Sequence, residues 1–419
     1  TVLAELRSIV SKILGLPIEE IKPDSQLADL GMDSLMGVEM GSDIETVFKC
    51  SPDQEEMMGV TSVEELSTVI WNTLQQGNSS ESSCTEDENS SSQSSVSSVD
   101  DSMPYNRGDI KKRQDLAQGF VDRYSANFTA PSPSSDAMSW NGSKKAVVIV
   151  TGATGSLGSH LTAKLAESPA VGTVVCLNRP SRSSSAVSRQ QDSFSAKGIE
   201  ISDESFKKLR VLECTISESK LGLSDEDYAW LVQNGSDIMH CAFPLSPTET
   251  VRGFEPQYVA MRNLIDLARD IASAQCSHSD QRRRVGFQFV SSISVVGFAK
   301  NHPVSEALRG IECAQPIGYS EAKWVCEHML EATLRQHPDF FRAMSVRCGQ
   351  IGGSSTSGFF NKNEHVPFMI KSAQSLRAWP DLAGHVLWVP VDQVATVMVE
   401  LIHVDDAIED TSIPNTVYH

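Results

Sequence analysis

Apolar residues recur at helical spacing through the first 76 positions of the chain. One helical face is formed by Val2, Leu3, Leu6, Ile9, Val10 and Ile13, and another by Leu66, Val69, Ile70 and Leu74. Thr61 or Ser62 is placed to cap the second of these helices. Between them, the Pro23-Asp24 turn precedes a further helix that begins near Ser34. The pattern predicts a small all-α four-helix bundle over residues 1–76.

The next segment, residues 77–143, is polar. From Gly77 to Ser102 about half of the residues are serine, mixed with Glu and Asp. Such a composition cannot bury enough apolar surface to offset chain entropy, so a flexible tether is expected. An amphipathic segment follows, with apolar positions at Ile110, Leu116, Phe120, Val121 and Tyr124. It is a docking helix, the remnant of another domain's edge, or a helix packed loosely on a neighbour. A second Ser/Pro-rich linker runs from Ala130 to Ser143.

From residue 144 to 419, short β-branched runs alternate with helical ones. The expected strands are Ala146–Val150, Val174–Leu177, Leu209–Leu212, Asp237–His240, Val285–Val290 and Ala343–Val346. Continuous apolar strands of this kind are buried on both faces, which is typical of a parallel sheet covered by helices. The fold class is therefore an α/β Rossmann-type domain, joined through the disordered linker to the α-helical bundle.

Composition limits the kinds of partner. The 419 residues are enough for two or three domains, and 35 basic against 54 acidic side chains give a net charge of -19. A surface this negative repels phosphate backbones and anionic lipids, so neither nucleic acid nor a membrane is expected as a partner. The nine cysteines show neither CxxC pairs nor metal-ligand spacing. They indicate reduced thiols in a cytoplasmic protein, without disulfides or a metal site.

The most specific motif is KKAVVIVTGATGSLGSHLTAKLAES, in which a buried strand leads through glycines into a helix. Glycine is required where the turn is tight and where backbone approaches a pyrophosphate, and the helix N-terminus offers N–H groups to phosphate. The motif predicts a dinucleotide site formed by Gly152, Thr154, Gly155, Ser156, Leu157 and Gly158. The next strand ends in Asn178 and Arg179 instead of an acidic residue. Arg179, with Arg182 nearby, favours the 2′-phosphate of NADPH.

Tyr319 and Lys323, in the segment GYSEAK, lie four residues apart on one helix face. Upstream, FVSSISVVG places hydroxyl groups at a strand end. Together with the TGxxGxxG pattern, these residues resemble the extended short-chain dehydrogenase/reductase superfamily. The resemblance implies that Tyr319 is the proton donor, that Lys323 contacts the nicotinamide ribose, and that Ser292 holds the substrate oxygen, with Ser291 and Ser294 as competitors. A cation at Lys323 would lower the tyrosine pKa from its usual value near 10.

Two segments depart from that superfamily's pattern. His240-Cys241-Ala242-Phe243 stands where Asn-Ala is common, and Thr215-Ile216 stands where Asp-Leu is common near the adenine. Both departures concern adenine and backbone contacts, and neither concerns hydride transfer.

In the first region, LADLGMDSLMGVEM places Ser34 at a helix start, after Asp33 and before Leu35. This sequence resembles that of acyl carrier proteins, most closely those of iterative polyketide synthases. The resemblance implies that Ser34 carries covalent 4′-phosphopantetheine, added by a phosphopantetheinyl transferase. It also implies an acyl chain held as a thioester.

The order of the two regions narrows the function. A reductase that follows a carrier resembles the terminal thioester reductase of fungal non-reducing polyketide synthases. Further matches are VRCGQIGG, GFFNKNEHVPFMIKSAQSL and LWVPVDQVA. The resemblance implies a carrier domain (1–76), a linker (77–143) and a reductase (144–419) that is truncated at its C-terminus. Upstream synthase domains would supply the carrier-bound acyl thioester, and NADPH-dependent reduction would release an aldehyde or, after a second reduction, an alcohol.

Three alternatives stay open. An extended reductase could act on a free ketone or nucleotide sugar, in which case the carrier has no use. The segment could belong to a carboxylic acid reductase related to nonribosomal peptide synthetases, with an adenylation domain upstream. It could also be an inactive fragment that serves only as a carrier and interaction module.

Overall fold

The computed structural model describes residues 2–14, 17–23, 25, 27, 40, 43–44, 47–48, 60, 62–77, 107–132, 145–181, 184–246, 248–275, 284–300, 302–362, 364–381, 387–403 and 416–419. The predicted helix start at Ser34 lies outside these residues, as do 78–106 and 133–144. The chain divides into two compact units. The first comprises Thr1–Arg107 with the short segments Ser246–Gly253 and Ile317–Tyr319. The second comprises Gly108–Leu245, Phe254–Pro316 and Ser320–His419.

In the first unit, helices α1 (Val2–Leu14) and α4 (Val63–Gly77) pack against each other. Their predicted apolar faces form one buried cluster, which includes Leu6, Val10, Leu66 and Ile70. Ser62 caps α4 reciprocally with Glu65: the Glu65 N–H donates to the Ser62 hydroxyl and the Ser62 N–H to the Glu65 carboxylate, both at 3.3 Å. The cap and the two helix faces are therefore those expected from the sequence.

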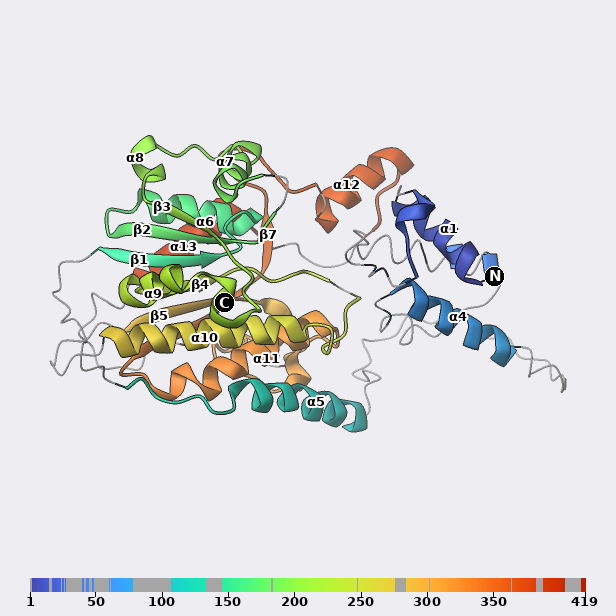
Figure 1. The fold of residues 1–419 in the computed structure, drawn as a ribbon, viewed down its shortest axis with the longest axis horizontal. Helices are drawn as coiled ribbons and strands as arrows, with labels where there is room; N and C mark the ends of the chain where they lie inside the picture. Colours follow the sequence, from blue (N-terminus) through green and yellow to red (C-terminus); the bar gives the residue numbers. More distant parts are fainter. Residues whose placement is uncertain are drawn as a thin grey trace. The chain divides into compact units, whose positions relative to one another are not determined.

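The second unit contains a seven-stranded parallel sheet with the strand order β3-β2-β1-β4-β5-β6-β9 (Figure 1). Its strands are β1 (Ala146–Thr151), β2 (Val171–Asn178), β3 (Leu209–Glu213), β4 (Asp237–His240), β5 (Val285–Ser292), β6 (Phe341–Cys348) and β9 (Val417–Tyr418). The strand order reverses at β1 and β4, and in open α/β sheets ligands bind outside the carboxyl ends of the strands at that point.

Helices cover both faces of this sheet. On one face, α6 (Ser156–Glu167) packs against α13 (Val391–His403), and together with β1 and β2 they enclose the core around Val148, Leu161 and Met398. On the other, α10 (Glu255–Gln275) packs against α9 (Asp225–Asn234) and the strands β4 and β5. The α/β fold class predicted from continuous apolar strands is confirmed.

The remaining elements surround these layers. They are α5 (Arg107–Ser125), α7 (Ala186–Ala196), α8 (Asp203–Phe206), α11 (Gly318–Ala332) and α12 (His365–Leu376), with a second parallel pair formed by β7 (Gln350–Gly352) and β8 (Trp388–Pro390). Helix α5 occupies the predicted amphipathic segment.

Candidate functional site

The turn from β1 into α6 requires glycine at two positions. Gly152 has φ +72°, and a Cβ there would lie 2.9 Å from the backbone nitrogen of Ala242. At Gly158, a Cβ would come within 2.0 Å of the Gly152 carbonyl oxygen. Both contacts involve backbone and cannot be relieved by a rotamer change, so the motif brings β1, α6 and the end of β4 together as closely as atoms allow.

The N-terminus of α6 fits the pyrophosphate of a dinucleotide. The helix begins at Ser156, and its N-cap residue Gly155 provides no side-chain hydrogen bond to the first turn. The N–H groups of that turn therefore lack a side-chain cap, and they carry the positive end of the helix dipole. Gly155 is exposed, and Thr154, Ser156 and Leu157 are partly exposed. The residues present thus fit the NADPH phosphates.

Helix α7 holds the carbonyl side of the same turn. The Gln190 amide donates to the Ala153 carbonyl at 3.1 Å, and Ser193 and Lys197 each donate to the Thr154 carbonyl at 3.0 Å. Burial lowers the pKa of Lys197. The sequence analysis did not identify these three residues, because polar side chains scattered along a helix form no motif. They fix the turn in its binding conformation before a nucleotide arrives.

At the end of β2, Asn178 and Arg179 have different surroundings. Asn178 is buried and donates to the Gln190 side chain at 3.2 Å, so it supports the glycine turn indirectly. Arg179 is exposed, and its carbonyl accepts a hydrogen bond from Arg189 at 2.6 Å. Arg182 lies outside the described residues. Arg179 therefore follows directly on a strand end at the nucleotide edge of the sheet, and its contact with a 2′-phosphate stays a prediction.

Where Asn-Ala is common, His240 replaces the amide and joins β4 to β1. Its Nδ1 lies 2.8 Å from the hydroxyl of Thr151, which also accepts the N–H groups of Cys241 at 3.2 Å and Ala242 at 3.1 Å. Burial, and then the nearby Lys323 charge, lowers the pKa of His240 to about 3. The ring therefore remains neutral, and it stacks on Phe289 at 5.6 Å.

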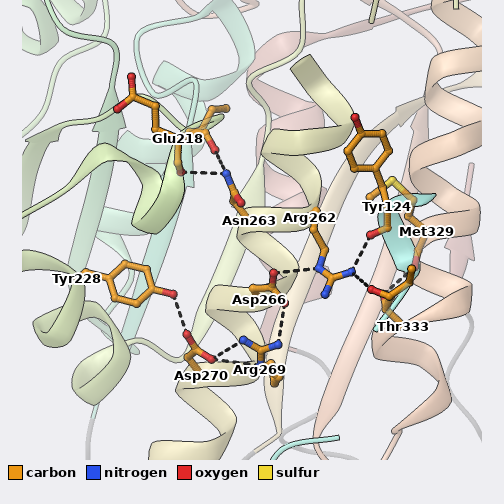
Figure 2. Close-up of polar contacts among 12 residues, drawn as sticks. Tyr124, Glu218, Tyr228, Arg262, Asn263, Asp266, Arg269, Asp270, Met329 and Thr333 are labelled. Atoms are coloured by element: carbon orange, nitrogen blue, oxygen red, sulfur yellow. Dashed lines mark hydrogen bonds and ion pairs between the residues drawn. The ribbon is translucent and has the colours of Figure 1, made fainter. Parts of the chain in front are cut away.

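The other departure, Thr215-Ile216, lies in the loop after β3. Asn263 of α10 holds this loop by donating to the carbonyls of Ile216 and Glu218, each at 2.9 Å (Figure 2). The loop is thus fixed through its backbone by a residue distant in sequence.

Lys323 is buried beside the carboxyl end of β5. Its ammonium donates to the Val290 carbonyl at 2.7 Å and lies 3.7 Å from the Phe243 ring centroid and 4.7 Å from that of Phe289. Burial lowers the pKa of Lys323 to about 8. The two aromatic faces and the carbonyl stabilise the cation in a site from which water is excluded.

The structure distinguishes the candidate serines. Ser291 is buried and donates to the Glu327 carboxylate at 2.5 Å, and Glu327 in turn pairs with Arg347 at 2.6 Å. Ser292 is partly exposed, and its hydroxyl oxygen accepts the N–H and the O–H of Ser294 at 3.2 and 3.0 Å. Ser291 thus belongs to a buried ionic network, whereas Ser292 remains at the accessible end of β5.

Tyr319 is half buried in the first turn of α11, four residues before Lys323 in the same helix. Gly318 precedes it, where a Cβ would lie 2.1 Å from the Glu249 carbonyl oxygen. Ser34 lies outside the described residues.

Within the described ranges, no group of three or more His, Cys, Asp or Glu side chains could hold a metal ion. No helix in the same residues has the length and apolar character needed to cross a membrane.

Two family models match the chain. The model described as male sterility protein, an NAD-binding family, matches residues 150–398, and that of the phosphopantetheine attachment site matches residues 4–70, a range that includes Ser34. These matches bear out the predicted cofactors, NADPH and 4′-phosphopantetheine.

The chain is similar to fungal polyketide synthases. It is 50% identical over 313 residues to an iterative polyketide synthase of Emericella nidulans, covering 71% of this chain and 11% of that protein. It is 53% identical over 274 residues to a non-reducing polyketide synthase of Aspergillus terreus, covering 65% of this chain and 10% of that protein. The chain therefore spans about a tenth of the length of these curated relatives.

Solved structures share its fold. The terminal R domain of the myxalamid PKS-NRPS pathway has a TM-score of 0.58 at 19% identity, covering 70% of this chain and 71% of that one. A thiolation-reductase di-domain from an archaeal nonribosomal peptide synthetase has a TM-score of 0.54 at 18% identity, covering 96% of this chain and 75% of that one. These structures share the fold, and the two family matches together with the polyketide synthase relatives confirm the predicted resemblance to a carrier followed by a reductase.

Proposed function

Because this chain belongs to the NAD-binding male sterility protein family, we propose that it releases a carrier-bound acyl chain by NADPH-dependent reduction of its thioester. One observation supports this proposal above all: the glycine turn of β1, the buried cation of Lys323 and the hydroxyl of Ser292 all lie at carboxyl ends of parallel strands. The phosphopantetheine match at residues 4–70 supplies the reason why the substrate is a thioester and not a free ketone.

Each nucleotide-site residue has a proposed task. The pyrophosphate is bound by the backbone of the glycine turn (Gly152, Thr154, Gly155 and Gly158) and by the first turn of α6, which contains Ser156 and Leu157. Arg179 pairs with the ribose 2′-phosphate and so selects NADPH. When bound, NADPH supplies the hydride that reduces the carbonyl carbon.

The catalytic residues act on the carbonyl oxygen. Tyr319 and Ser292 donate hydrogen bonds to it, which stabilises the negative charge that develops there, and Tyr319 delivers its proton to that oxygen. Lys323 favours the resulting phenolate by its charge and contacts the nicotinamide ribose. The resulting hemithioacetal returns its hydroxyl proton to the Tyr319 phenolate as the C–S bond breaks, the sulfur takes up a proton from solvent and leaves as the carrier thiol, and an aldehyde is released.

The carrier region presents the substrate. Ser34, modified by a phosphopantetheinyl transferase, holds the acyl chain that upstream polyketide synthase domains deliver. We assign the carrier domain to 1–76, the linker to 77–143 and the reductase to 144–419. The linker keeps the thioester at high effective concentration near the reductase, so that transfer within one chain exceeds reaction with free thioesters.

The test is single-turnover reduction of acyl chains loaded on the pantetheine arm of this chain. We expect oxidation of one NADPH per aldehyde released, read from the loss of NADPH absorbance and from trapping of the product. Tyr319→Phe should abolish turnover while binding NADPH normally, and Ser34→Ala should accept no acyl chain yet still bind NADPH. Full turnover by Tyr319→Phe, or no NADPH oxidation by the loaded wild-type chain, would contradict the proposal.

A further inference from the structure

Helix α5 is packed firmly within the second unit. Its residues Ala117, Phe120 and Val121 are buried, and the Phe120 ring lies 5.0 Å from that of Tyr258 in α10. Removing such apolar side chains from water stabilises the packed position of the helix. Of the three interpretations of the amphipathic segment, a loosely packed helix does not describe these contacts.

Arg113, in the N-terminal half of α5, binds the region where α11 begins. Its Nε lies 2.5 Å from Oε1 of Glu321, and its Nη2 donates to the Ala314 carbonyl at 3.1 Å and the Ile311 carbonyl at 3.4 Å. The side chains of Arg113 and Glu321 are only 16% and 10% exposed. Burial raises the pKa of Glu321, and the Arg113 charge opposes that shift. A partly desolvated pair of this kind holds its two elements in one geometry.

The position of these partners in the sequence gives the contact its importance. Glu321 lies between Tyr319 and Lys323 in α11, and Ile311 and Ala314 belong to the segment that leads into this helix. Arg113 therefore fixes the first turns of α11 and the chain that enters them with a single side chain.

The C-terminal end of α5 is fixed to α10. Arg262 donates to the carbonyls of Tyr124 at 2.9 Å and Ala126 at 2.7 Å, which would otherwise lack partners at the helix end (Figure 2). Asp266 in turn accepts a hydrogen bond from Arg262 at 2.9 Å. Because α5 is held at its end as well as through Arg113, it cannot shift without breaking one of these contacts.

We infer that Arg113 is a positioning residue for the reduction: through Glu321 and two carbonyls, it aligns the helix that carries Tyr319 and Lys323. The inference rests on the proposed function for its catalytic consequence. The helix that follows the tether is, on this view, a working part of the reductase and not a spacer.

The test compares full-length variants in two measurements. In Arg113→Ala, kcat for thioester reduction should fall at least about tenfold while KM for NADPH stays within about twofold, because misplacement affects the transition state more than cofactor binding. Amide hydrogen exchange across residues 311–323 should become faster in the same variant. Arg113→Lys, which can pair with Glu321 but not fork to the carbonyls, should recover part of kcat. Arg123→Ala is the matched control, since Arg123 lies on the same helix as Arg113 and its ion pair with Glu255 of α10 is exposed, so kcat and hydrogen exchange should not change.

The outcomes separate the two proposals. If Arg113→Ala folds, Glu321→Ala must show a similar loss of kcat, and in the double variant the two effects must be non-additive. If Arg113→Ala fails to fold, Glu321→Ala alone must show that loss of kcat. Wild-type kcat in Arg113→Ala or Glu321→Ala, or additive effects, would overturn the inference. If even the wild-type chain reduces no thioester, the proposed function fails, and the exchange measurement still decides whether Arg113 orders the start of α11. Unchanged exchange would overturn it.

Discussion

Thr151 and His240 face each other in register at the ends of β1 and β4, with the threonine hydroxyl 2.8 Å from Nδ1 of the ring. Since that oxygen already accepts two backbone N–H groups, its own proton points to His240, and the ring carries its proton on Nε2. The pair lies where the strand order reverses, and Thr151 directly precedes Gly152 of the glycine turn. Besides the backbone ladder, the Thr151 hydroxyl therefore joins the end of β1 to the residues that follow β4.

Thr151→Val should weaken both the fold and the nucleotide site. The substitution keeps the shape of the side chain but leaves the N–H groups of Cys241 and Ala242 without their acceptor, which costs about 1–3 kcal/mol in free energy of unfolding. NADPH affinity should fall as well, because Gly152 packs against Ala242. Denaturant unfolding and fluorescence titration measure the two effects. Thr396→Val, whose exposed hydroxyl donates to a helix carbonyl, should change neither.

Gly158→Ala tests the close approach of α6 to β1. The added methyl would lie 2.0 Å from the Gly152 carbonyl oxygen, so the backbone must shift. We expect the free energy of unfolding to fall by roughly 1–3 kcal/mol and the affinity for NADPH to fall as well. Gly119→Ala is the control, because nothing lies within 4 Å of its Cβ position in α5. That variant should gain up to about 1 kcal/mol from helix propensity. Equal effects of the two substitutions on the denaturation midpoint would refute the assigned packing.

Much of this organisation was predictable from the sequence because it depends on local patterns. Continuous apolar runs specified the parallel strands, and the glycines specified the turn into α6. The contacts that hold the turn were not predictable, because Gln190 of α7 and Lys197, the residue that follows this helix, meet Ala153 and Thr154 only after the sheet has formed. A motif encodes what must be close in sequence, whereas the side chains that support it are fixed by tertiary packing.

The serines at the end of β5 illustrate the same limit. Alternation along a strand predicts that Ser291 and Ser292 face opposite sides, but not which side holds a buried ion pair. The structure shows which side this is: Ser291 donates a hydrogen bond to Glu327, which forms the buried ion pair with Arg347.

Arg179→Ala should change cofactor preference. Without the guanidinium, the dissociation constant for NADPH should rise roughly tenfold, equivalent to about 1.4 kcal/mol, while that for NADH stays nearly constant. Titration of both cofactors measures the ratio. Lys207→Ala removes an exposed cation that precedes β3, at the amino edge of the sheet, and should leave the ratio unchanged. A parallel loss of affinity for both cofactors in Arg179→Ala would show that the residue does not read the 2′-phosphate.

The rate of reduction should decline at alkaline pH. Lys323 loses its proton near pH 8 in the folded chain, and the neutral amine no longer favours the Tyr319 phenolate, so kcat should fall above that pH. The free energy of unfolding changes in the opposite direction as the pH rises. Between pH 8 and the ordinary lysine pKa of 10.5 the unfolded chain binds more protons, so this group's contribution to the free energy of unfolding rises with pH. The residual activity of Lys323→Met should show no such fall in kcat above pH 8. If the fall persists in that variant, another group must cause it.

Ser291→Ala and Ser292→Ala should separate stability from catalysis. Ser291 donates to the fully buried Glu327, so its removal leaves a carboxylate oxygen with one partner fewer and should cost about 1–3 kcal/mol in unfolding free energy. In Ser291→Ala the rate of thioester reduction should stay close to that of the wild type.

Ser292 accepts hydrogen bonds only from Ser294 among the described residues and is partly exposed, so Ser292→Ala should unfold like the wild type. Its kcat, however, should fall about 100-fold, as expected when one donor to a developing oxyanion is lost. The opposite assignment, with Ser291→Ala stable but inactive, would move the substrate-binding role to the buried serine and require the Glu327–Arg347 pair to open during turnover.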